Sequence, residues 1–201
     1  MKKTLLSTLI LATLGMASAV ATAQENPWMV RVRAVNVNWE NGGQANTGAG
    51  KVWADDKTIP EVDISYFFTK NIAAELVLTY PQKVDVYSNT TKLGYLRALP
   101  PSLVLQYHFT NFGQVKPYVG AGINYTTFGR HAQLAGPSSV DKSSLGYVAQ
   151  VGVDYMIDKH WGVNLDVKYV NIDTNVVSGG SNLGELKLNP VTAGVGVTYK
   201  F

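Results

Sequence analysis

From Trp28 to the last residue, apolar side chains alternate with polar or small ones at nearly every second position. A period of two is typical of a β-strand, whose successive side chains point to opposite faces, whereas an amphipathic helix repeats about every 3.6 residues. The clearest case is 191–201, where Val, Ala, Tyr and Phe share one face and Thr, Gly and Lys share the other. Since no convincing amphipathic helix appears, an all-β fold is predicted.

Eight segments follow this pattern, and the connections between them alternate in length. The segments cover 28–39, 62–68, 74–80, 103–109, 119–125, 145–155, 161–169 and 191–201. Short connections lie at 69–72, 110–115 and 156–160, and long polar ones lie at 40–57, 81–98, 128–144 and 173–185. Strands of about ten residues, joined alternately by tight turns and long loops, are typical of an antiparallel transmembrane β-barrel. Eight antiparallel strands are therefore predicted, with both chain ends on the side of the short turns.

The first segment is less regular than the others. Its apolar residues occupy even positions from Trp28 to Val32 and odd positions from Val35 to Trp39. A β-bulge near Ala34 would keep all of them on one face. Alternatively, the strand continues unbroken and its second half turns apolar side chains to the other face.

The aromatic residues indicate which face points outward. They occupy the apolar face, mostly at strand ends with aliphatic residues between them: Tyr66, Phe68, Tyr80, Tyr107, Phe109, Tyr125, Tyr147, Tyr155, Trp161, Tyr169, Tyr199 and Phe201. Amphipathic rings are most stable at the headgroup boundary, so two aromatic girdles around an aliphatic belt indicate a barrel that spans a bilayer. A soluble barrel is expected to hold bulky aromatics in the centre of its core. The apolar face is therefore predicted to contact lipid.

The opposite face carries charges of both signs mixed with glycines. The charged and titratable residues are Arg31, Arg33, Glu61, Asp63, Glu75, His108, Lys116, Asp154, Asp166, Lys168 and Lys200. An eight-stranded barrel is only wide enough inside for side chains or one small ligand. A lumen of paired charges without a water-filled channel is therefore predicted. Asn164→Asp on this face is expected to be far milder than a charge at Leu165 on the lipid face.

The first residues have the features of a secretory signal peptide. A pair of lysines precedes an apolar run from Leu5 to Met16, and Ala21–Ala23 has the small-x-small pattern of a cleavage site. An apolar run of about a dozen residues is shorter than the roughly 20 that a membrane-spanning helix needs. Residues 1–23 are therefore predicted to be removed, which leaves 24–201 as the barrel.

The chain ends in an alternating strand whose last aromatic residues are Tyr199 and Phe201. A terminal phenylalanine of this kind is the signal that the barrel assembly machinery reads, and it also suits the aromatic girdle. Together with the signal peptide and the absence of cysteine, it predicts an eight-stranded antiparallel barrel in the outer membrane of a Gram-negative bacterium. The expected surroundings are outer-membrane lipid and lipopolysaccharide.

The remaining residues indicate no other chemistry. His108, His131 and His160 are far apart and form no metal-ligand motif. The loop 131–141 contains His, Ser and Asp, the residue types of a catalytic triad, but loops of this composition contain such sets by chance. No catalytic residue, metal or cofactor is predicted. The formal net charge of +3, of which the signal segment contributes two, predicts no nucleic-acid partner.

Several motifs resemble those of the outer membrane protein W family. The most characteristic is PYVGAGINYTTF at 117–128, preceded by LPPSL at 99–103. The segments QVGVDY at 150–155, NIDT at 171–174 and LNP at 188–190 are similar to further family motifs. The resemblance implies an eight-stranded barrel whose lumen holds a hydrophobic pocket open to the outside. Small apolar molecules are expected to enter there and to leave sideways through the barrel wall into the membrane.

The resemblance also implies which residues form the pocket. The Leu and Trp that gate its floor in the family correspond to Val77 and Lys168 in this sequence. Val170 is expected nearby, joined by Trp39 if the first strand has no bulge. The Lys168 ammonium is expected either to pair with a carboxylate such as Asp166 or to bind the head group of an amphiphile. In the second case, ligands with an anionic or polar end are favoured.

The pair Pro100 and Pro101 suits a sideways exit. Proline has no backbone N–H to donate, so two in succession interrupt the hydrogen-bond ladder and leave part of the wall unpaired. The alternative interpretation is a strand that merely begins after them.

Two functions of different classes therefore stay open. The first is passive uptake or binding of small hydrophobic or amphipathic molecules in the lumen. The second is a structural or interaction role, in which the four long loops contact envelope components or external partners. A substantial apolar cavity facing inward near Val77 and Val170 favours the first, whereas ion pairs that fill the lumen up to the loops favour the second.

Overall fold

The structure is a computed structural model that describes residues 26–39, 52–54, 56–88, 91–129, 133–134, 138–140, 142–178 and 181–201. The predicted signal peptide at 1–23 lies outside these residues. In the part of the chain that is described, no helix has the length and apolar character needed to span a membrane.

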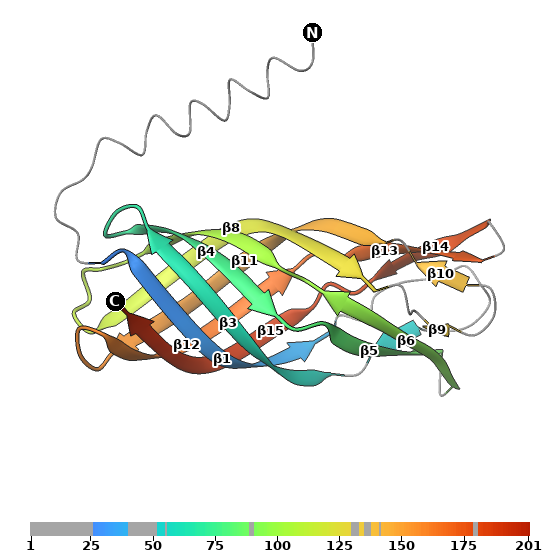
Figure 1. The fold of residues 1–201 in the computed structure, drawn as a ribbon, viewed down its shortest axis with the longest axis horizontal. Helices are drawn as coiled ribbons and strands as arrows, with labels where there is room; N and C mark the ends of the chain where they lie inside the picture. Colours follow the sequence, from blue (N-terminus) through green and yellow to red (C-terminus); the bar gives the residue numbers. More distant parts are fainter. Residues whose placement is uncertain are drawn as a thin grey trace, which may run out of the picture.

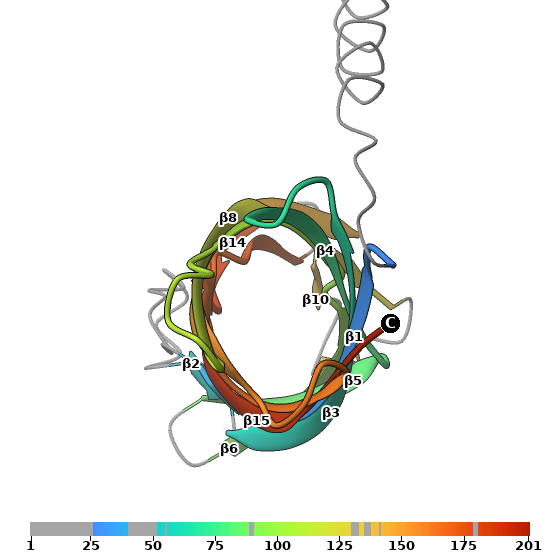
Figure 2. The same ribbon diagram turned by 90° about the vertical axis from the view of Figure 1, so that its left-hand side faces the viewer.

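Eight strands form a closed barrel, seen from the side in Figure 1 and along its axis in Figure 2. They are β1 (Trp28–Asn38), β3 (Lys57–Phe67), β4 (Ile72–Thr79), β7 (Ser102–His108), β8 (Val115–Phe128), β11 (Ser143–Met156), β12 (Trp161–Val170) and β15 (Val191–Lys200). Neighbours pair antiparallel in this order, and β15 pairs with β1 to close the ring. The predicted eight-stranded antiparallel barrel is confirmed.

The two ends of the barrel differ. Short turns join β3 to β4, β7 to β8 and β11 to β12 at the end where β1 begins and the chain terminates, which we call the short-turn end (Figure 1). The opposite, long-loop end carries further strands. These are β2 (Val52–Ala54), β5 (Gln82–Ser88), β6 (Thr91–Leu99), β9 (Gln133–Leu134), β10 (Ser138–Val140), β13 (Asp173–Ser178) and β14 (Ser181–Lys187).

The prediction of loops at 81–98 and 173–185 is therefore wrong. β5 and β6 form a hairpin, and β13 and β14 form another, which pairs with β10. Both hairpins extend past the ring of eight strands in Figure 1. Strands beyond the lipid-spanning part of a barrel need not alternate strictly, and strict alternation was the signal by which the other strands were recognised.

The structure decides between the two interpretations of the first strand. β1 keeps one continuous register with β15 and with β3, so it has no bulge at Ala34. Its odd-numbered residues are buried throughout, from Met29 and Arg31 to Val37 and then Trp39. The second half of β1 therefore turns apolar side chains into the lumen.

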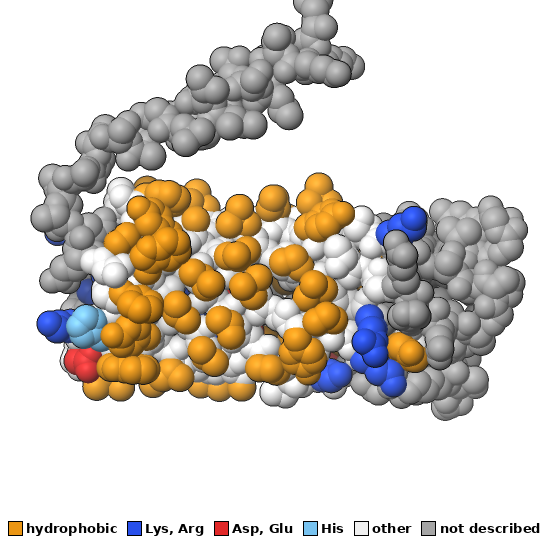
Figure 3. Space-filling model, viewed as in Figure 1, with side chains coloured by type: hydrophobic (Ala, Val, Ile, Leu, Met, Phe, Trp, Pro, Cys, Tyr) orange, Lys and Arg blue, Asp and Glu red, His pale blue; other side chains and the backbone are white. Residues whose placement is uncertain are grey.

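The outer surface has the predicted apolar belt. Figure 3 shows hydrophobic side chains in a broad band across the visible face of the barrel, with charged side chains gathered at its two ends. Aliphatic residues such as Leu105 and Leu165, each more than half exposed, lie in the middle of their strands. Tyr107 and Phe109 contact edge to face near the short-turn end, as do Trp161 and Tyr199. The aromatic girdle predicted at this end is thus present.

The β11–β12 turn is stabilised by one exposed carboxylate. Asp158 Oδ1 accepts hydrogen bonds from the backbone N–H groups of His160 and Trp161, each at 2.7 Å. These two bonds to the charged form lower the pKa of Asp158 below its usual 3.8. The same type of local side-chain to backbone bond favours Asp at the start of a tight turn.

Candidate ligand pocket in the barrel lumen

A network of buried ion pairs fills the part of the lumen nearer the short-turn end. Arg31 is fully buried and forms a two-pronged pair with Asp154, Nε to Oδ1 at 3.0 Å and Nη2 to Oδ2 at 2.7 Å. Its Nη1 also contacts Glu75 and donates to Ser65 Oγ at 3.3 Å. The paired-charge lumen predicted from the alternation is observed here.

A second arginine extends this network toward the long-loop end. Arg33 Nε donates to Asp63 Oδ2 at 2.7 Å, and Nη1 lies 3.0 Å from Asp166 Oδ1. Tyr118 donates its hydroxyl to the other oxygen of Asp166 at 2.7 Å, as Gln150 does with Nε2 at 2.8 Å. These side chains cross the lumen from several strands and close it.

Two glycines provide the room that the long side chains need. A Cβ at Gly196 would lie 2.7 Å from Arg33 Cγ and 2.1 Å from the backbone oxygen of Val32. A Cβ at Gly152 would lie 2.4 Å from the hydroxyl oxygen of Tyr118. Both glycines are therefore packed too closely against their neighbours to carry a side chain without a shift.

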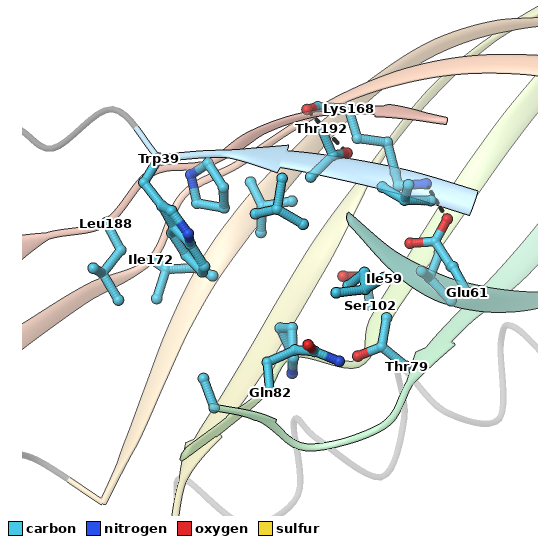
Figure 4. Close-up of a pocket in the computed structure, with 17 residues that line it drawn as sticks. Trp39, Ile59, Glu61, Thr79, Gln82, Ser102, Lys168, Ile172, Leu188 and Thr192 are labelled. Atoms are coloured by element: carbon cyan, nitrogen blue, oxygen red, sulfur yellow. Dashed lines mark hydrogen bonds and ion pairs between the residues drawn. The ribbon is translucent and has the colours of Figure 1, made fainter. Parts of the chain in front are cut away.

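Above the ion pairs, toward the long-loop end, the lumen becomes apolar and contains a cavity (Figure 4). Its apolar lining is Val35, Val37, Trp39, Ile59, Val77, Ala98, Pro100, Val170, Ile172, Leu188 and Pro190, and its polar lining is Glu61, Thr79, Gln82, Ser102, Lys168 and Thr192. The cavity volume is about 50 Å³, several times the roughly 10–15 Å³ that one buried water needs. A cavity of this size has room for a few waters, and a ligand as large as an aromatic ring must move lining side chains.

The four residues proposed for the pocket and its gate all line this one cavity. Val77, Val170 and Trp39 contribute apolar surface from β4, β12 and the residue after β1. Lys168 lies at the floor, where its Nζ donates to Glu61 Oε1 at 2.7 Å and to Asp166 Oδ1 at 2.8 Å. The structure therefore shows the paired alternative for Lys168.

Acidic side chains outnumber basic ones around Lys168 and the two arginines. Within the network, the basic side chains Arg31, Arg33 and Lys168 face five acids, Glu61, Asp63, Glu75, Asp154 and Asp166. An anionic head group at the floor would therefore approach Glu61 as well as the ammonium. The expectation of ligands with an anionic or polar end stays a prediction.

The backbone ladder of the wall is interrupted beside Pro100 and Pro101. β4 and β7 pair as far as Val77 and Ser102, and pairing resumes with Gln82 and Ala98 at the start of the β5–β6 hairpin. All residues at 78–81 and 99–101 are described, and no backbone pair joins these two stretches across the wall. On its other side, the Pro101 carbonyl accepts a hydrogen bond from the backbone of β8, N to O 3.1 Å.

Of the six polar residues of the lining, only Lys168 was proposed for the pocket from the sequence. Thr79 continues the inward parity of Glu75 and Val77, a signal that places it in the lumen. Gln82 follows Pro81 in a segment interpreted as a loop, so no periodicity pointed to it. Both lie next to the interruption of the ladder.

The other candidate residues lie elsewhere. Tyr199 and Phe201 contact each other edge to face at the short-turn end, and Phe201 N donates to the Trp28 carbonyl at 3.1 Å. In the loop 131–141, His131 and Asp141 lie outside the described residues. Among the described residues, no group of three or more His, Asp or Glu side chains has a metal-binding arrangement.

A closed barrel with a lipid-facing apolar belt, an aromatic girdle and an ion-paired lumen is an integral β-barrel membrane protein of the outer-membrane type. The model of the OmpW family matches residues 26–201, and the chain belongs to that family. It is accordingly a protein of the bacterial outer membrane.

Individual relatives agree with this assignment. The chain is 45% identical to the uncharacterized outer-membrane protein y4mB of Sinorhizobium fredii, over 94% of this chain and 84% of that one. It is 32% identical to outer membrane protein W of Escherichia coli strain K12 over the full length of both. A more distant relative in Pseudomonas aeruginosa, 27% identical over 89% of this chain and 90% of that one, is the dibenzothiophene metabolism operon protein PahQ.

The fold is also that of a solved structure. The crystal structure of the outer membrane protein OprG from Pseudomonas aeruginosa superimposes with a TM-score of 0.68 at 25% identity, covering 89% of this chain and 98% of that one.

Proposed function

We propose that this barrel binds small hydrophobic molecules in the lumen cavity and admits them passively, releasing them sideways through the wall into the membrane. The observation that carries the proposal is the division of the lumen. Apolar side chains line the half that faces the long-loop end, and buried ion pairs close the half below it. Since long loops face the outside in such barrels and short turns face the periplasm, the cavity faces the source of external molecules.

The ion-paired half supports a sideways exit. A hydrophobic molecule that continued down the lumen would have to displace the contacts of Arg31 and Arg33, both nearly fully buried. Breaking a buried charge network is strongly unfavourable. The wall beside Pro100 and Pro101 offers a different path, because Val77, Ala98, Pro100 and the cavity lie directly against the interrupted ladder.

The name of one relative supports small hydrophobic molecules as the ligand class. PahQ is named for the metabolism of dibenzothiophene, an apolar aromatic compound. An apolar cavity in the lumen was expected for uptake, and a lumen filled by ion pairs up to the loops was expected for an interaction role. An apolar cavity near Val77 and Val170 is present, which supports uptake.

Cellular uptake with a matched proline control tests this proposal. Cells that express the barrel should accumulate radiolabelled naphthalene faster than cells with an empty vector. Pro100→Val with Pro101→Val restores two N–H donors, and we expect it to slow uptake while binding to the purified barrel changes less than about twofold. Pro60→Val, on the β1–β3 wall opposite Ala34, is the control and should leave uptake unchanged. Uptake equal to that of the vector would contradict a transport role.

A further inference from the structure

The polar groups of the cavity lining differ in whether the protein already satisfies them. Lys168 and Glu61 bond to each other, and Ser102 Oγ accepts from Asn124 Nδ2 at 3.0 Å. Thr192 Oγ1 is within 3.5 Å of the Lys168 carbonyl. These groups need no ligand.

Two neighbouring polar groups of the lining have no hydrogen-bond partner in the part of the chain that is described. Gln82 Oε1 and Thr79 Oγ1 are both buried, and neither has a hydrogen-bond partner among the described residues. The Gln82 side chain as a whole is 5% exposed. Buried polar atoms are nearly always paired in native proteins, so two orphaned atoms on one cavity wall need an explanation.

The orientation of the Gln82 amide shows which chemistry is unsatisfied. Its Nε2 donates to the backbone carbonyl of Tyr80 at 2.8 Å, an acceptor that only the NH₂ group can serve. Oε1 is therefore the free atom, and it can only accept. The Thr79 hydroxyl can both donate and accept.

Figure 4 shows Gln82 and Thr79 next to each other on one side of the cavity, with Lys168 and Thr192 on the opposite side. The lining near them includes the apolar Val77, Ala98 and Pro100. It also includes Glu61, which pairs with Thr79 across the β3–β4 ladder, and Ser102, but both of these already have partners within the protein. Thr79 and Gln82 therefore carry the unsatisfied polar atoms of this wall, beside the interruption of the ladder.

We propose that the cavity selects neutral apolar molecules that carry one hydroxyl group, of the phenol or alcohol class, over their ethers and parent hydrocarbons. The ligand O–H donates to Gln82 Oε1, and the ligand oxygen accepts from the Thr79 hydroxyl. A hydroxyl matches both groups at once, whereas an ether oxygen leaves the amide oxygen unpaired. This inference rests on the proposed function, because it assigns a preference to the same cavity.

The test compares 1-naphthol with 1-methoxynaphthalene, which share a ring system and differ in the donor. Binding to the barrel, purified from outer membranes and reconstituted in phosphatidylcholine vesicles, is followed at neutral pH by fluorescence. The signal of protein-free vesicles is subtracted. We expect 1-naphthol to bind about 3- to 10-fold more tightly, the ratio that one net hydrogen bond provides.

Variants test the contributions of the two residues. Gln82→Met keeps the length of the side chain without its acceptor, and Thr79→Val keeps the shape without the hydroxyl. Gln82→Met should weaken 1-naphthol by at least about threefold and leave the ether within about twofold. Thr79→Val should weaken both compounds, because both ligand oxygens accept from the Thr79 hydroxyl. Gln114→Met at the short-turn end, where Gln114 accepts from Tyr155, is the matched control and should change neither affinity.

The outcomes separate this inference from the proposed function. Saturable binding of both compounds with equal affinity overturns the hydroxyl preference and leaves the pocket intact, as does an equal loss of both in Gln82→Met. The absence of saturable binding of either compound overturns both proposals. Because the wild-type comparison needs no variant, a folding defect in Gln82→Met does not prevent the decision.

Discussion

Arg31 on β1 and Asp154 on β11 form a two-pronged ion pair inside the barrel although 123 residues separate them in the sequence. Both are fully buried. A guanidinium with two parallel N–H donors matches a carboxylate in this way, and the pair is stronger than a single neutral hydrogen bond. The contact joins strands far apart in the ring and helps to close the lumen below the cavity.

Removal of this arginine should destabilise the barrel strongly. Arg31→Met leaves Asp154 buried without a cation and removes one of the two arginines that contact Glu75, which is expected to lower the free energy of unfolding by about 3–5 kcal/mol. Urea titrations in lipid vesicles measure the change. Lys159→Met in the exposed β11–β12 turn is the control and should stay within about 0.5 kcal/mol. A loss below about 1 kcal/mol for Arg31→Met would show that the pair does not hold the barrel closed.

The floor of the cavity should behave as a coupled pair. Lys168→Met removes one of the two cations that pair with the buried Glu61 and Asp166, the other being Arg33, and we expect a loss of about 3–5 kcal/mol. Glu61→Gln removes one of the buried carboxylates that Lys168→Met leaves underpaired, so the double variant should be more stable than the sum of the single changes predicts. A double-mutant cycle in urea measures this coupling, expected between about 0.5 and 3 kcal/mol. Additive effects would mean that Lys168 and Glu61 do not interact.

The free-energy cost of placing a charge on the outward face should depend on how deep in the membrane the charge lies. Leu165 lies in the middle of β12, and Leu145 lies opposite Tyr125 toward the long-loop end. Leu165→Arg is expected to cost about 2–4 kcal/mol near the midplane, and Leu145→Arg about 0–1 kcal/mol near the interface. Refolding titrations in bilayers compare the two. The reverse order would place the membrane elsewhere on the barrel.

The β11–β12 turn should contribute stability that depends on pH. The folded state lowers the pKa of Asp158, so the charged carboxylate stabilises the fold above its usual pKa of 3.8, and this contribution is lost as the pH falls through the lower folded value. Asp158→Asn should therefore be less stable than wild type at neutral pH, with the difference shrinking in strong acid. Parallel urea titrations at several pH values check this, and a difference independent of pH would exclude the charge as its cause.

Alternation was enough to predict the barrel because lipid imposes it. Each outward position of a spanning strand must be apolar, so Leu103, Val163 and Val195 mark their strands clearly. The hairpins β5–β6 and β13–β14 are under no such constraint and were taken for loops. β1 stayed ambiguous because its lumen side is charged at Arg31 and apolar at Val35, a change that depends on what faces it across the barrel.

Contacts between distant strands explain what the sequence left open at the site. Lys168 donates to Glu61, which is 107 residues away in the sequence. The orientation of the Gln82 amide, which leaves its oxygen without a partner among the described residues, is set by the bond from Nε2 to the backbone carbonyl of Tyr80 in the same irregular segment. The expectation that Asn164→Asp is mild stays a prediction. Asn164 Nδ2 donates to Asp154 Oδ1 at 2.9 Å, so the substitution would bring two carboxylates together, whereas Asn164 Oδ1 accepts from Arg33 Nη1 at 3.2 Å, which favours a negative charge there.

The most direct test of the account is where a hydrophobic ligand binds within the barrel. Methyl chemical shifts of valine, measured by NMR during a naphthalene titration in lipid bilayers, compare inward and outward positions in one experiment. We expect saturable shifts at Val35, Val77 and Val170, which line the cavity, and only gradual, non-saturating shifts at the lipid-facing Val163 and Val197. Saturable shifts confined to the outward valines, or none at the cavity, would contradict a ligand pocket in the lumen.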